Sequence, residues 1–271
     1  MSGGTCRLEV QRISGDKVER LADVVVKERP VTVLLNDTEL ATLMCSPKDL
    51  EYLAVGFLFS EGLVGGRKDI KRTIVDDKDG VVWVETKKDM KPSLGFAAKR
   101  FITTGCGKGL TFVDASRSRR ELKTRSRSTL RASSVPNLMK EFLHRSRLFR
   151  TTGGTHSAAL CSTRHILVFN EDIGRHSAID KVIGECVLKG IRMNDRVLLT
   201  SGRISSEIVV KVARSRVPIV VSKSAPTDLA VKLADNFGIT LVGFARGARM
   251  NVYTNGSRIL SKARITERSQ K

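Results

Sequence analysis

The second half of the chain alternates short apolar runs with longer segments of helical periodicity, and this alternation restricts the fold more than any other feature. The predicted strands are Ser157–Cys161, His165–Phe169, Arg196–Thr200, Pro218–Ser222 and Ile239–Phe244. The predicted helices are Arg175–Lys189, Ser205–Arg214 and Thr227–Phe237. Strands that alternate with helices form a sheet with parallel strands and with helices on its faces. We therefore expect an α/β domain.

The first hundred residues show a different pattern, in which apolar runs occur in pairs around turn sequences. Two hairpins are predicted: Val31–Leu35 with Glu39–Met44, and Ile70–Val75 with Val81–Thr86. Between them, Ser46 and Pro47 are typical of the start of a helix, and Gly62 is typical of its end. We expect an antiparallel, β-rich α+β region with one helix.

A basic segment without apolar periodicity separates these two parts. Residues 116–131 are rich in Ser and Arg, and residues 116–150 carry a net charge of +9, against +1 for residues 1–115. Such a segment predicts a solvated loop or linker, followed by a helix over Pro136–Arg150. The expected organisation is an N-terminal region over 1–115, a basic linker over 116–135 and a C-terminal α/β domain over 136–271.

The net charge of the whole chain, +20, favours anionic partners. Nucleic acid, acidic protein surfaces and phosphorylated cofactors all fit this charge, and charge alone does not separate them. No apolar run of about 18 residues is present, and Met1–Arg12 lacks the apolar core of a secretory signal. Five cysteines with no close pair favour reduced thiols. We expect a cytoplasmic protein that does not enter a membrane.

Cys106 has the surroundings that best favour a reactive thiol. It lies between Gly105 and Gly107, where the backbone is open, and Lys108 favours the thiolate that attacks sulfur. A free cysteine in an ordinary turn is an equally good interpretation of this spacing. Cys6 is expected in a frayed terminus. Burial in apolar runs is expected for the remaining three: Cys45, Cys161 and Cys186.

Three predicted strands end in sequences suited to anions. The segments Ser201–Arg203, Lys223–Thr227 and Phe244–Arg249 each follow a strand. In an open α/β sheet, the carboxyl ends of parallel strands share one edge, where ligands bind and helix N-termini present free N–H groups. The segments also contain arginines suited to phosphate oxygens: Arg203, Arg246 and Arg249. Ordinary turns with surface arginines are the alternative for any one segment, but three together favour a phosphate site.

The segment Glu171–His176 has two interpretations. Its adjacent carboxylates, followed by Arg175 and His176, are suited to acid–base chemistry. Acidic residues also favour the positive end of a helix, so the segment is equally explained as a helix entry, which we prefer. His156 is likewise either a structural residue or a ligand. The sequence contains no zinc motif of the Cys-x-x-Cys or His-Glu-x-x-His type and no Walker loop, so no metal site is expected.

These segments together resemble the formate dehydrogenase accessory sulfurtransferase family, FdhD. Each motif is weak alone, but their joint occurrence in this order is specific and covers most of the chain. The motifs are Ser60-Glu61-Gly62, Thr104-Gly105-Cys106-Gly107, Thr152-Gly153-Gly154-Thr155-His156, Glu171-Asp172-Ile173-Gly174-Arg175-His176, Ser201-Gly202-Arg203, Ser224-Ala225-Pro226-Thr227 and Gly243-Phe244-Ala245-Arg246.

The resemblance implies a C-terminal three-layer domain of the cytidine-deaminase-like type without zinc, and a cytosolic homodimer. It implies that a cysteine desulfurase loads Cys106 with persulfide sulfur. The sulfur would then pass to the bis-molybdopterin guanine dinucleotide cofactor, with molybdenum or tungsten, and so activate formate dehydrogenase. The segment that matches the family's cofactor-binding residues is Phe244, Ala245, Arg246, Gly247, Ala248 and Arg249.

One departure from the family pattern concerns the reactive loop. Well-known members carry Cys-x-x-Cys there, whereas this chain has Cys106-Gly107-Lys108-Gly109. A single thiol still suffices for a persulfide, because attack and release involve one sulfur at a time. Two rival functions are a basic nucleic-acid-binding module and a deaminase-like hydrolase. Two Tyr and one Trp offer little stacking surface for bases, so nucleic acid is the less favoured partner.

Overall fold

The computed structural model describes residues 3–88, 100–102 and 122–261. These residues form a six-stranded sheet, a five-stranded sheet and two separate two-stranded pairs. The six-stranded sheet has the order β10-β9-β11-β12-β13-β14, and β11, β12 and β13 are parallel, as the alternating pattern predicts. Its strands are β9 (His156–Cys161), β10 (Ile166–Asp172), β11 (Val197–Thr200), β12 (Ile219–Ser222), β13 (Thr240–Arg246) and β14 (Arg249–Thr254).

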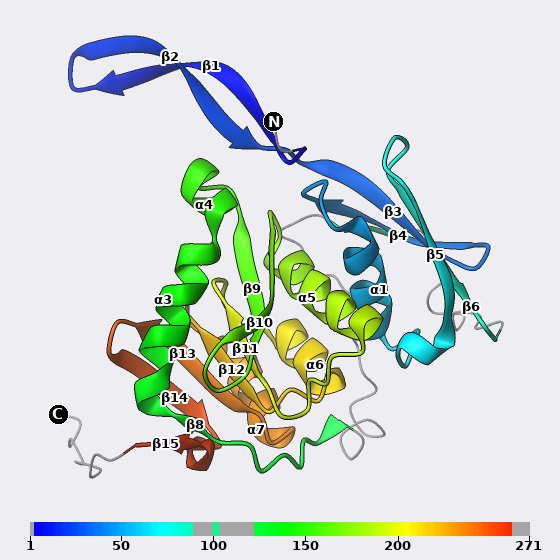
Figure 1. The fold of residues 1–271 in the computed structure, drawn as a ribbon. Coiled ribbons are helices and arrows are strands. Elements are labelled where there is room, and N and C mark those ends of the chain that lie inside the picture. Colours follow the sequence, from blue (N-terminus) through cyan, green and yellow to red (C-terminus); the bar gives the residue numbers. More distant parts are fainter. Residues whose placement is uncertain (1–2, 89–99, 103–121, 262–271) are drawn as a thin grey trace.

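Helices cover both faces of this sheet (Figure 1). On one face, Leu138 and Phe142 of α3 (Val135–Arg145) share a core with Leu199 of β11. On the other face the core includes α5 (Arg175–Lys189), α6 (Ser206–Arg214) and α7 (Asp228–Asn236). The C-terminal part is therefore an α/β unit of three layers.

The single helix expected over Pro136–Arg150 is divided at Ser146 into α3 and α4 (Arg147–Thr152). Ser146 Oγ lies 2.8 Å from Ser157 Oγ, which ties the break to β9. The Glu171 carboxylate then accepts the N–H groups of Leu148 and Phe149 at 3.0 and 2.9 Å, and these contacts start the new helix. The expectation of one continuous helix is wrong because a carboxylate distant in sequence supplies the cap.

The five-stranded sheet has the order β5-β6-β3-β4-β7 and is mixed. Its strands are β3 (Arg29–Leu35), β4 (Thr38–Cys45), β5 (Ile70–Asp76), β6 (Val81–Thr86) and β7 (Arg100–Ile102). The two predicted hairpins are confirmed, but β3 pairs with β6, and β4 with β7, in parallel. The expected purely antiparallel region is therefore wrong, because local turns fix each hairpin but not how hairpins join at their edges.

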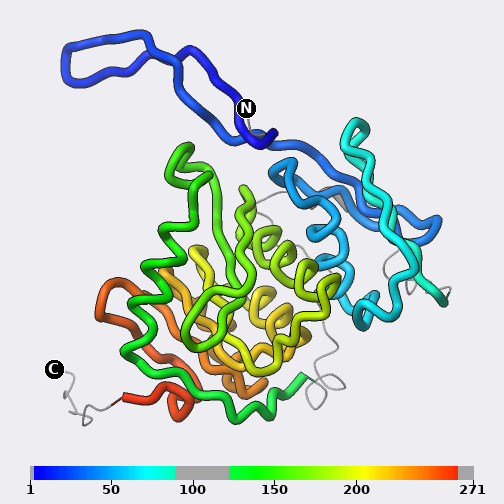
Figure 2. The backbone as a smooth tube through the Cα atoms, viewed as in Figure 1, coloured from blue at the N-terminus to red at the C-terminus, as the bar shows by residue number. Residues whose placement is uncertain are grey.

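Helix α1 (Leu50–Glu61) lies against α5 (Figure 2). One hydrophobic core includes residues of α1, of α5 and of both sheets. The crossing is close. A Cβ atom at Gly56 would lie 1.8 Å from the carbonyl oxygen of Asp180, and one at Gly184 would lie 1.9 Å from that of Tyr52. Glycine is therefore required at both positions.

The two ends of α1 compare differently with the sequence. Gly62 ends the helix with a left-handed φ of 78°, as predicted. Asp49 occupies the N-cap position instead of Ser46, so the predicted cap is wrong. The Ser46 side chain instead donates to Asp172 of β10 at 3.0 Å. The Ser46 hydroxyl is therefore used in a tertiary contact and does not cap α1.

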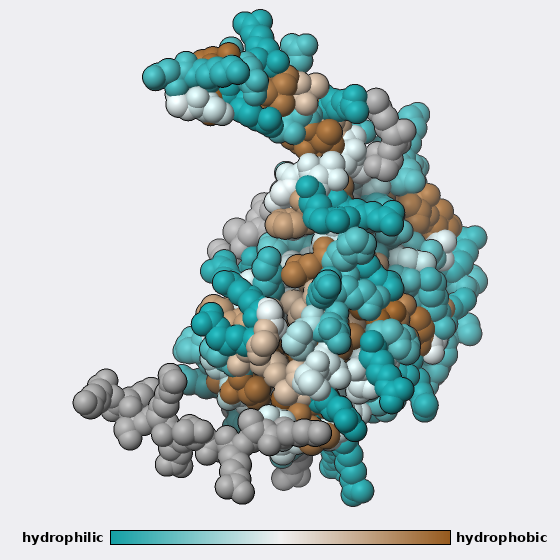
Figure 3. Space-filling view, turned by 60° about the vertical axis from the view of Figure 1, so that its left-hand side comes forward, coloured by the Kyte–Doolittle hydropathy of each residue, from teal (hydrophilic) through white to brown (hydrophobic). Residues whose placement is uncertain are grey.

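The hairpin of β1 (Thr5–Ser14) and β2 (Lys17–Val26) was not predicted, and it projects from the body (Figures 1 and 3). Cys6 lies within β1, half-buried, so the expected frayed terminus is wrong at this residue. Its apolar residues Leu8, Ile13 and Val18 are exposed, so they do not form the buried face that alternation normally indicates. The pairing is local, and the base of the hairpin lies near α4.

The described part of the basic segment, residues 122–131, is packed against the C-terminal domain. Thr124 is buried, and its N–H donates to the carbonyl of Phe237 at 2.8 Å. Arg258 Nε donates to Ser126 O at 3.2 Å. β8 (Leu130–Arg131) pairs in parallel with β15 (Ile259–Leu260). Residues 123–129 nevertheless form no helix or strand, and Lys123, Arg125 and Arg127 are exposed, as expected for a solvated loop. Residues 116–121 lie outside the described part.

Short 3-10 turns complete the fold: η1 (Arg67–Asp69), η3 (Ala132–Ser134) and η4 (Gly256–Arg258). Among the described helices, none combines the length and the hydropathy that a membrane crossing requires.

Candidate functional site

The carboxyl ends of β10, β11, β12 and β13 meet at one edge of the six-stranded sheet. β11–β13 are parallel, and β10 points the same way because β9 is antiparallel to both β10 and β11. The loops after β11 and β12 continue the pairing, since Ile204 N donates to Ala225 O at 3.1 Å. Helix α6 then begins after Ser205, and α7 begins after Thr227, whose hydroxyl accepts from Ala230 N. The convergence predicted from the three strand ends is present.

A pocket of about 400 Å³ lies at this edge. Its lining includes Phe149, His156, Ser201, Lys223, Ser224 and Arg246. Arg246 Nε donates to Lys223 O at 3.1 Å, and the guanidinium lies 5.7 Å from the centre of the Phe244 ring. These contacts hold Arg246 beside Lys223, and both cationic residues line the pocket.

The predicted cofactor-binding segment forms a hairpin. Phe244, Ala245 and Arg246 end β13, Gly247 and Ala248 form the turn, and Arg249 starts β14. Arg246 and Arg249 are register partners across the turn, and both are exposed. Of the six residues, Arg246 lines the pocket. The sequence predicted a strand that ends at Phe244, but a bulge with a positive φ of 51° at Phe244 lets the strand continue to Arg246.

His156 opens β9 at the same edge. Its Nδ1 lies 3.3 Å from Ser201 Oγ, and Ser201 Oγ also accepts the N–H of Ser157 at 3.0 Å. Burial lowers the pKa of His156 below its usual value, and the nearby Arg175 and Arg203 lower it further. The imidazole is therefore neutral at pH 7, so it can donate or accept one hydrogen bond without adding charge.

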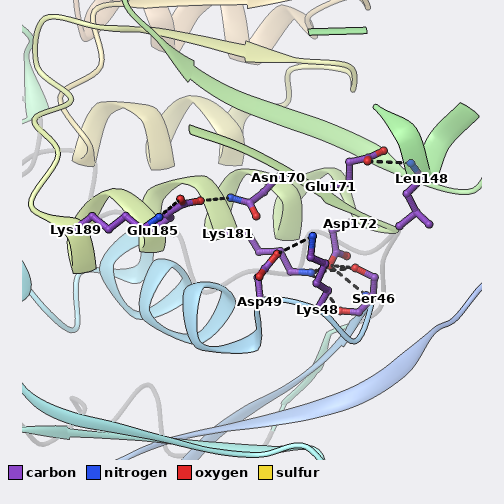
Figure 4. A network of polar contacts seen from close by, with 10 residues as sticks. All are labelled: Ser46, Lys48, Asp49, Leu148, Asn170, Glu171, Asp172, Lys181, Glu185 and Lys189. Carbon is purple, nitrogen blue, oxygen red and sulfur yellow. Dashed lines mark hydrogen bonds and ion pairs between the residues drawn. The ribbon is translucent and has the colours of Figure 1, made fainter. Parts of the chain in front are cut away.

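The two carboxylates of Glu171-Asp172 stabilise the fold. Glu171 caps α4, and Asp172 forms a buried ion pair of 2.6 Å with Lys181 (Figure 4). Asp172 also accepts from Ser46 N at 3.1 Å and from Gly174 N at 3.0 Å. Neither carboxylate lines the pocket. The arrangement fits the helix-entry interpretation and gives no support to acid–base chemistry by these two groups.

Cys106 lies outside the described residues. The other predicted thiols are where the apolar runs placed them, because Cys45, Cys161 and Cys186 are all buried. Burial raises the pKa of each to about 12, so all three remain protonated thiols at neutral pH. Within the described part of the chain, no group of three or more His, Cys, Asp or Glu side chains is suited to a metal ion.

The strand that leads toward Cys106 runs to the same edge. β7 is parallel to β4, with Ile102 beside Leu43. β4 continues to Ser46, which is hydrogen-bonded to Asp172 at the end of β10. Cys106 follows Ile102 by four residues, a reach of at most about 14 Å. The last described residues before Cys106 thus run in the direction of the Ser46–Asp172 contact at the end of β10.

Lys223 and Arg175 lie in segments that the sequence analysis recognised, but neither was named there as an anion-binding residue. Lys223 and Ser224 line the pocket, and Arg175 lies beside it against Gly202. Lys223 belongs to a strand-end segment that was recognised, so its charge was a usable signal. Arg175 follows a strand that the sequence pattern ends at Phe169, so the pattern gave no sign that it shares this edge.

The fold and the edge define an α/β protein with a pocket at the carboxyl ends of parallel strands, lined in part by the basic residues Lys223 and Arg246. The chain belongs to the FdhD/NarQ family, whose sequence model matches residues 26–260. It is 40% identical over 255 residues to the sulfur carrier protein FdhD of Bacillus subtilis (strain 168), covering 93% of this chain and 96% of that protein. It is 42% identical over 237 residues to the sulfur carrier protein FdhD of Bacillus pumilus (strain SAFR-032), covering 88% and 90%.

A solved structure shows the same fold. A Desulfotalea psychrophila protein described as a formate dehydrogenase accessory protein matches with a TM-score of 0.78 at 27% identity, over 95% of this chain and 100% of that one. This chain therefore has the same mixed α/β fold as that solved structure.

Proposed function

We propose that this chain is a sulfur carrier that accepts persulfide sulfur on Cys106 from a cysteine desulfurase and delivers it to a bis-molybdopterin guanine dinucleotide cofactor, thereby activating formate dehydrogenase. The observation that carries the proposal is the glycine-flanked Cys106 within a chain 40% identical to a sulfur carrier protein over nearly its whole length. The structural neighbour is described as a formate dehydrogenase accessory protein, which supports formate dehydrogenase as the enzyme that is activated.

The chemistry needs one thiolate and two transfers. The Cys106 thiolate attacks the terminal sulfur of the desulfurase persulfide, and the desulfurase cysteine leaves as a thiolate. In the second transfer the cofactor's acceptor centre supplies the electron pair of the new bond to sulfur. The sulfur–sulfur bond breaks, and Cys106 leaves as the thiolate. The same single cysteine is thus regenerated without a second thiol in the loop.

The described geometry supports delivery at the sheet edge. β7 leads the chain toward Cys106 alongside β4, whose continuation contacts Asp172 at that edge. The Phe244–Arg249 hairpin is proposed to hold the guanine dinucleotide, because Arg246 and Lys223 place two cations at one pocket. Molybdenum and tungsten cofactors share this nucleotide, so both fit. The cofactor is the substrate of the transfer.

Three further features belong to the same proposal. The C-terminal three-layer unit is proposed to be of the cytidine-deaminase-like type without zinc. The protein is proposed to act as a homodimer in the cytoplasm. Reduced thiols are consistent with that compartment, since Cys45, Cys161 and Cys186 are free.

The test is intact-mass analysis after incubation with a cysteine desulfurase and cysteine. The wild-type chain should gain about 32 Da, the mass of one sulfur atom, and lose it on reduction. Cys106→Ala should gain nothing and should fail to activate formate dehydrogenase. Cys6→Ala is the matched control, because Cys6 is the most accessible thiol among the described residues, and it should behave as wild type. A sulfur adduct and full activation in Cys106→Ala would refute the proposal.

A further inference from the structure

Polar side-chain atoms without partners gather at the start of α5 and α6. Among the described residues, five buried side-chain nitrogen or oxygen atoms make no hydrogen bond. Three of them belong to Arg175 and His176, the first residues of α5, and to Ser205, the N-cap of α6. Buried polar groups are almost always satisfied in folded proteins, so a local group of exceptions needs a cause.

The same place concentrates positive charge. Gly202, two residues after the end of β11, lies close to Arg175 and His156. A Cβ atom at Gly202 would lie 2.8 Å from Arg175 Cβ and 3.4 Å from His156 Nδ1. Arg175 therefore lies against Gly202, and Arg203 is the next residue. Burial lowers the pKa of Arg175, and repulsion by Arg203 lowers it further, while Glu207 acts in the opposite direction.

The neighbouring carboxylates offset only part of this positive charge, because Glu207 acts on Arg175 while Asp172 is paired with Lys181. Asp172 is bonded to Lys181 and Ser46, and Glu207 lies 3.5 Å from His176 Nε2. Both α5 and α6 begin here, and the first N–H groups of a helix have no partner within it. Arg175, Arg203 and the first turns of α5 and α6 therefore lie close together.

We propose that Arg175 and Arg203, with the N–H groups at the beginnings of α5 and α6, form a phosphate subsite separate from the cations at Arg246. A planar guanidinium fits phosphate oxygens in pairs, and a helix N-terminus adds N–H donors and a partial positive charge. His156 is close enough to Arg175 and Arg203 for both to lower its pKa, and it lines the pocket together with Ser201 and Arg246. A ligand with more than one phosphoryl group can therefore engage both groups of cations.

The identity of the ligand rests on the proposed function, since a guanine dinucleotide cofactor carries phosphoryl groups. The subsite itself does not, because inorganic pyrophosphate has the same chemistry without the nucleoside. This distinction makes the two proposals separable by experiment.

The experiment is titration calorimetry of the full chain with inorganic pyrophosphate and with GDP at low ionic strength. Arg175→Ala and Arg203→Ala should each weaken pyrophosphate binding about tenfold, the loss expected for one charge-assisted contact. Arg175→Lys and Arg203→Lys keep the charge but not the fork and should recover part of the affinity. Arg164→Ala, an exposed arginine in the β9–β10 turn, is the matched control and should change nothing.

Each outcome decides between the proposals. Unchanged pyrophosphate affinity in a folded Arg203→Ala protein would overturn the subsite, as would an equal loss in Arg164→Ala, which would indicate bulk charge alone. If pyrophosphate binds through these arginines and GDP does not bind, the subsite stands and the guanine-nucleotide proposal falls. If GDP binding depends on Arg246 but not on Arg175 or Arg203, the subsite is overturned and the proposed function remains.

Discussion

The middle and the beginning of α5 present opposite electrostatic situations. In the middle, Lys181 is fully buried and pairs with Asp172 at 2.6 Å, and Asp180 accepts two contacts of 2.7 and 2.8 Å from Lys211. At the beginning, Arg175 and His176 carry buried nitrogen atoms without hydrogen-bond partners. A charged group that is satisfied inside the protein contributes to the fold, whereas one left unsatisfied at an edge is available to a ligand.

The satisfied region is also where the two sheets are joined. Lys181 donates to the carbonyl and the hydroxyl of Ser46, in the segment between β4 and α1. Ser60 of α1 donates to Asp180 at 2.7 Å. The N-terminal sheet is therefore held to α5 by polar contacts in addition to the glycine crossing. Substitutions in the middle of α5 should lower stability, and substitutions at its beginning should lower affinity.

The largest effect is expected for Lys181→Met. Removing one partner of a buried ion pair leaves Asp172 charged and unpaired, which should lower the free energy of unfolding by about 3–5 kcal/mol. Urea denaturation measures this directly. Lys189→Met is the control on the same helix, because its pair with Glu185 is exposed and should be weak. Equal midpoints for Lys181→Met and wild type would mean that the pair does not hold the two sheets together.

Gly184→Ala should have the next largest effect on stability. The added Cβ would lie 1.9 Å from the backbone oxygen of Tyr52, so α1 and α5 must move apart. We expect a loss of about 1–3 kcal/mol, even though alanine favours a helix more than glycine does. Gly256→Ala is the control, since its Cβ would meet Val252 at an ordinary 3.6 Å. A Gly184→Ala protein with the wild-type melting temperature would contradict the close crossing.

His176 should make stability depend on pH. Burial lowers its pKa to about 3 in the folded protein, against about 6.5 when unfolded. Below pH 6.5 the unfolded chain takes up a proton that the folded chain does not, so stability is lost as pH falls from 6.5 toward 3. We expect about 2 kcal/mol of this loss between pH 7 and pH 4.5. His176→Gln should show a shallower decline, and parallel curves for the two proteins would refute the assignment.

Much of the fold could be predicted because it depends on local patterns. α5 was predicted with the bounds that the structure has, since its apolar spacing and the glycines at both ends are local signals. The β3–β4 and β5–β6 hairpins follow from their turns. The parallel pairing of β3 with β6 was missed because it joins segments about fifty residues apart, and no periodicity encodes it.

The candidate site was predictable only in outline. The three strand ends converge as expected, but the role of Ser46 was misread because Asp172, 126 residues away, takes its hydroxyl. Arg175 was treated as part of a motif with Glu171 and Asp172, whereas the structure separates their roles. Which polar groups are satisfied depends on tertiary contacts, so a sequence identifies the donors but not the unpartnered ones.

The smallest effect on stability is expected for Arg203→Gln, and here the sign is informative. Arg203 is exposed, and its charge lies close enough to lower the pKa of Arg175. Removing it should relieve this repulsion, so the free energy of unfolding should stay within about 0.5 kcal/mol of wild type or rise slightly. Thermal melts at low and high salt measure this, and any gain should shrink as salt screens the repulsion. A clear loss of stability instead would show that Arg203 has a structural partner, and the beginning of α5 would then resemble its middle.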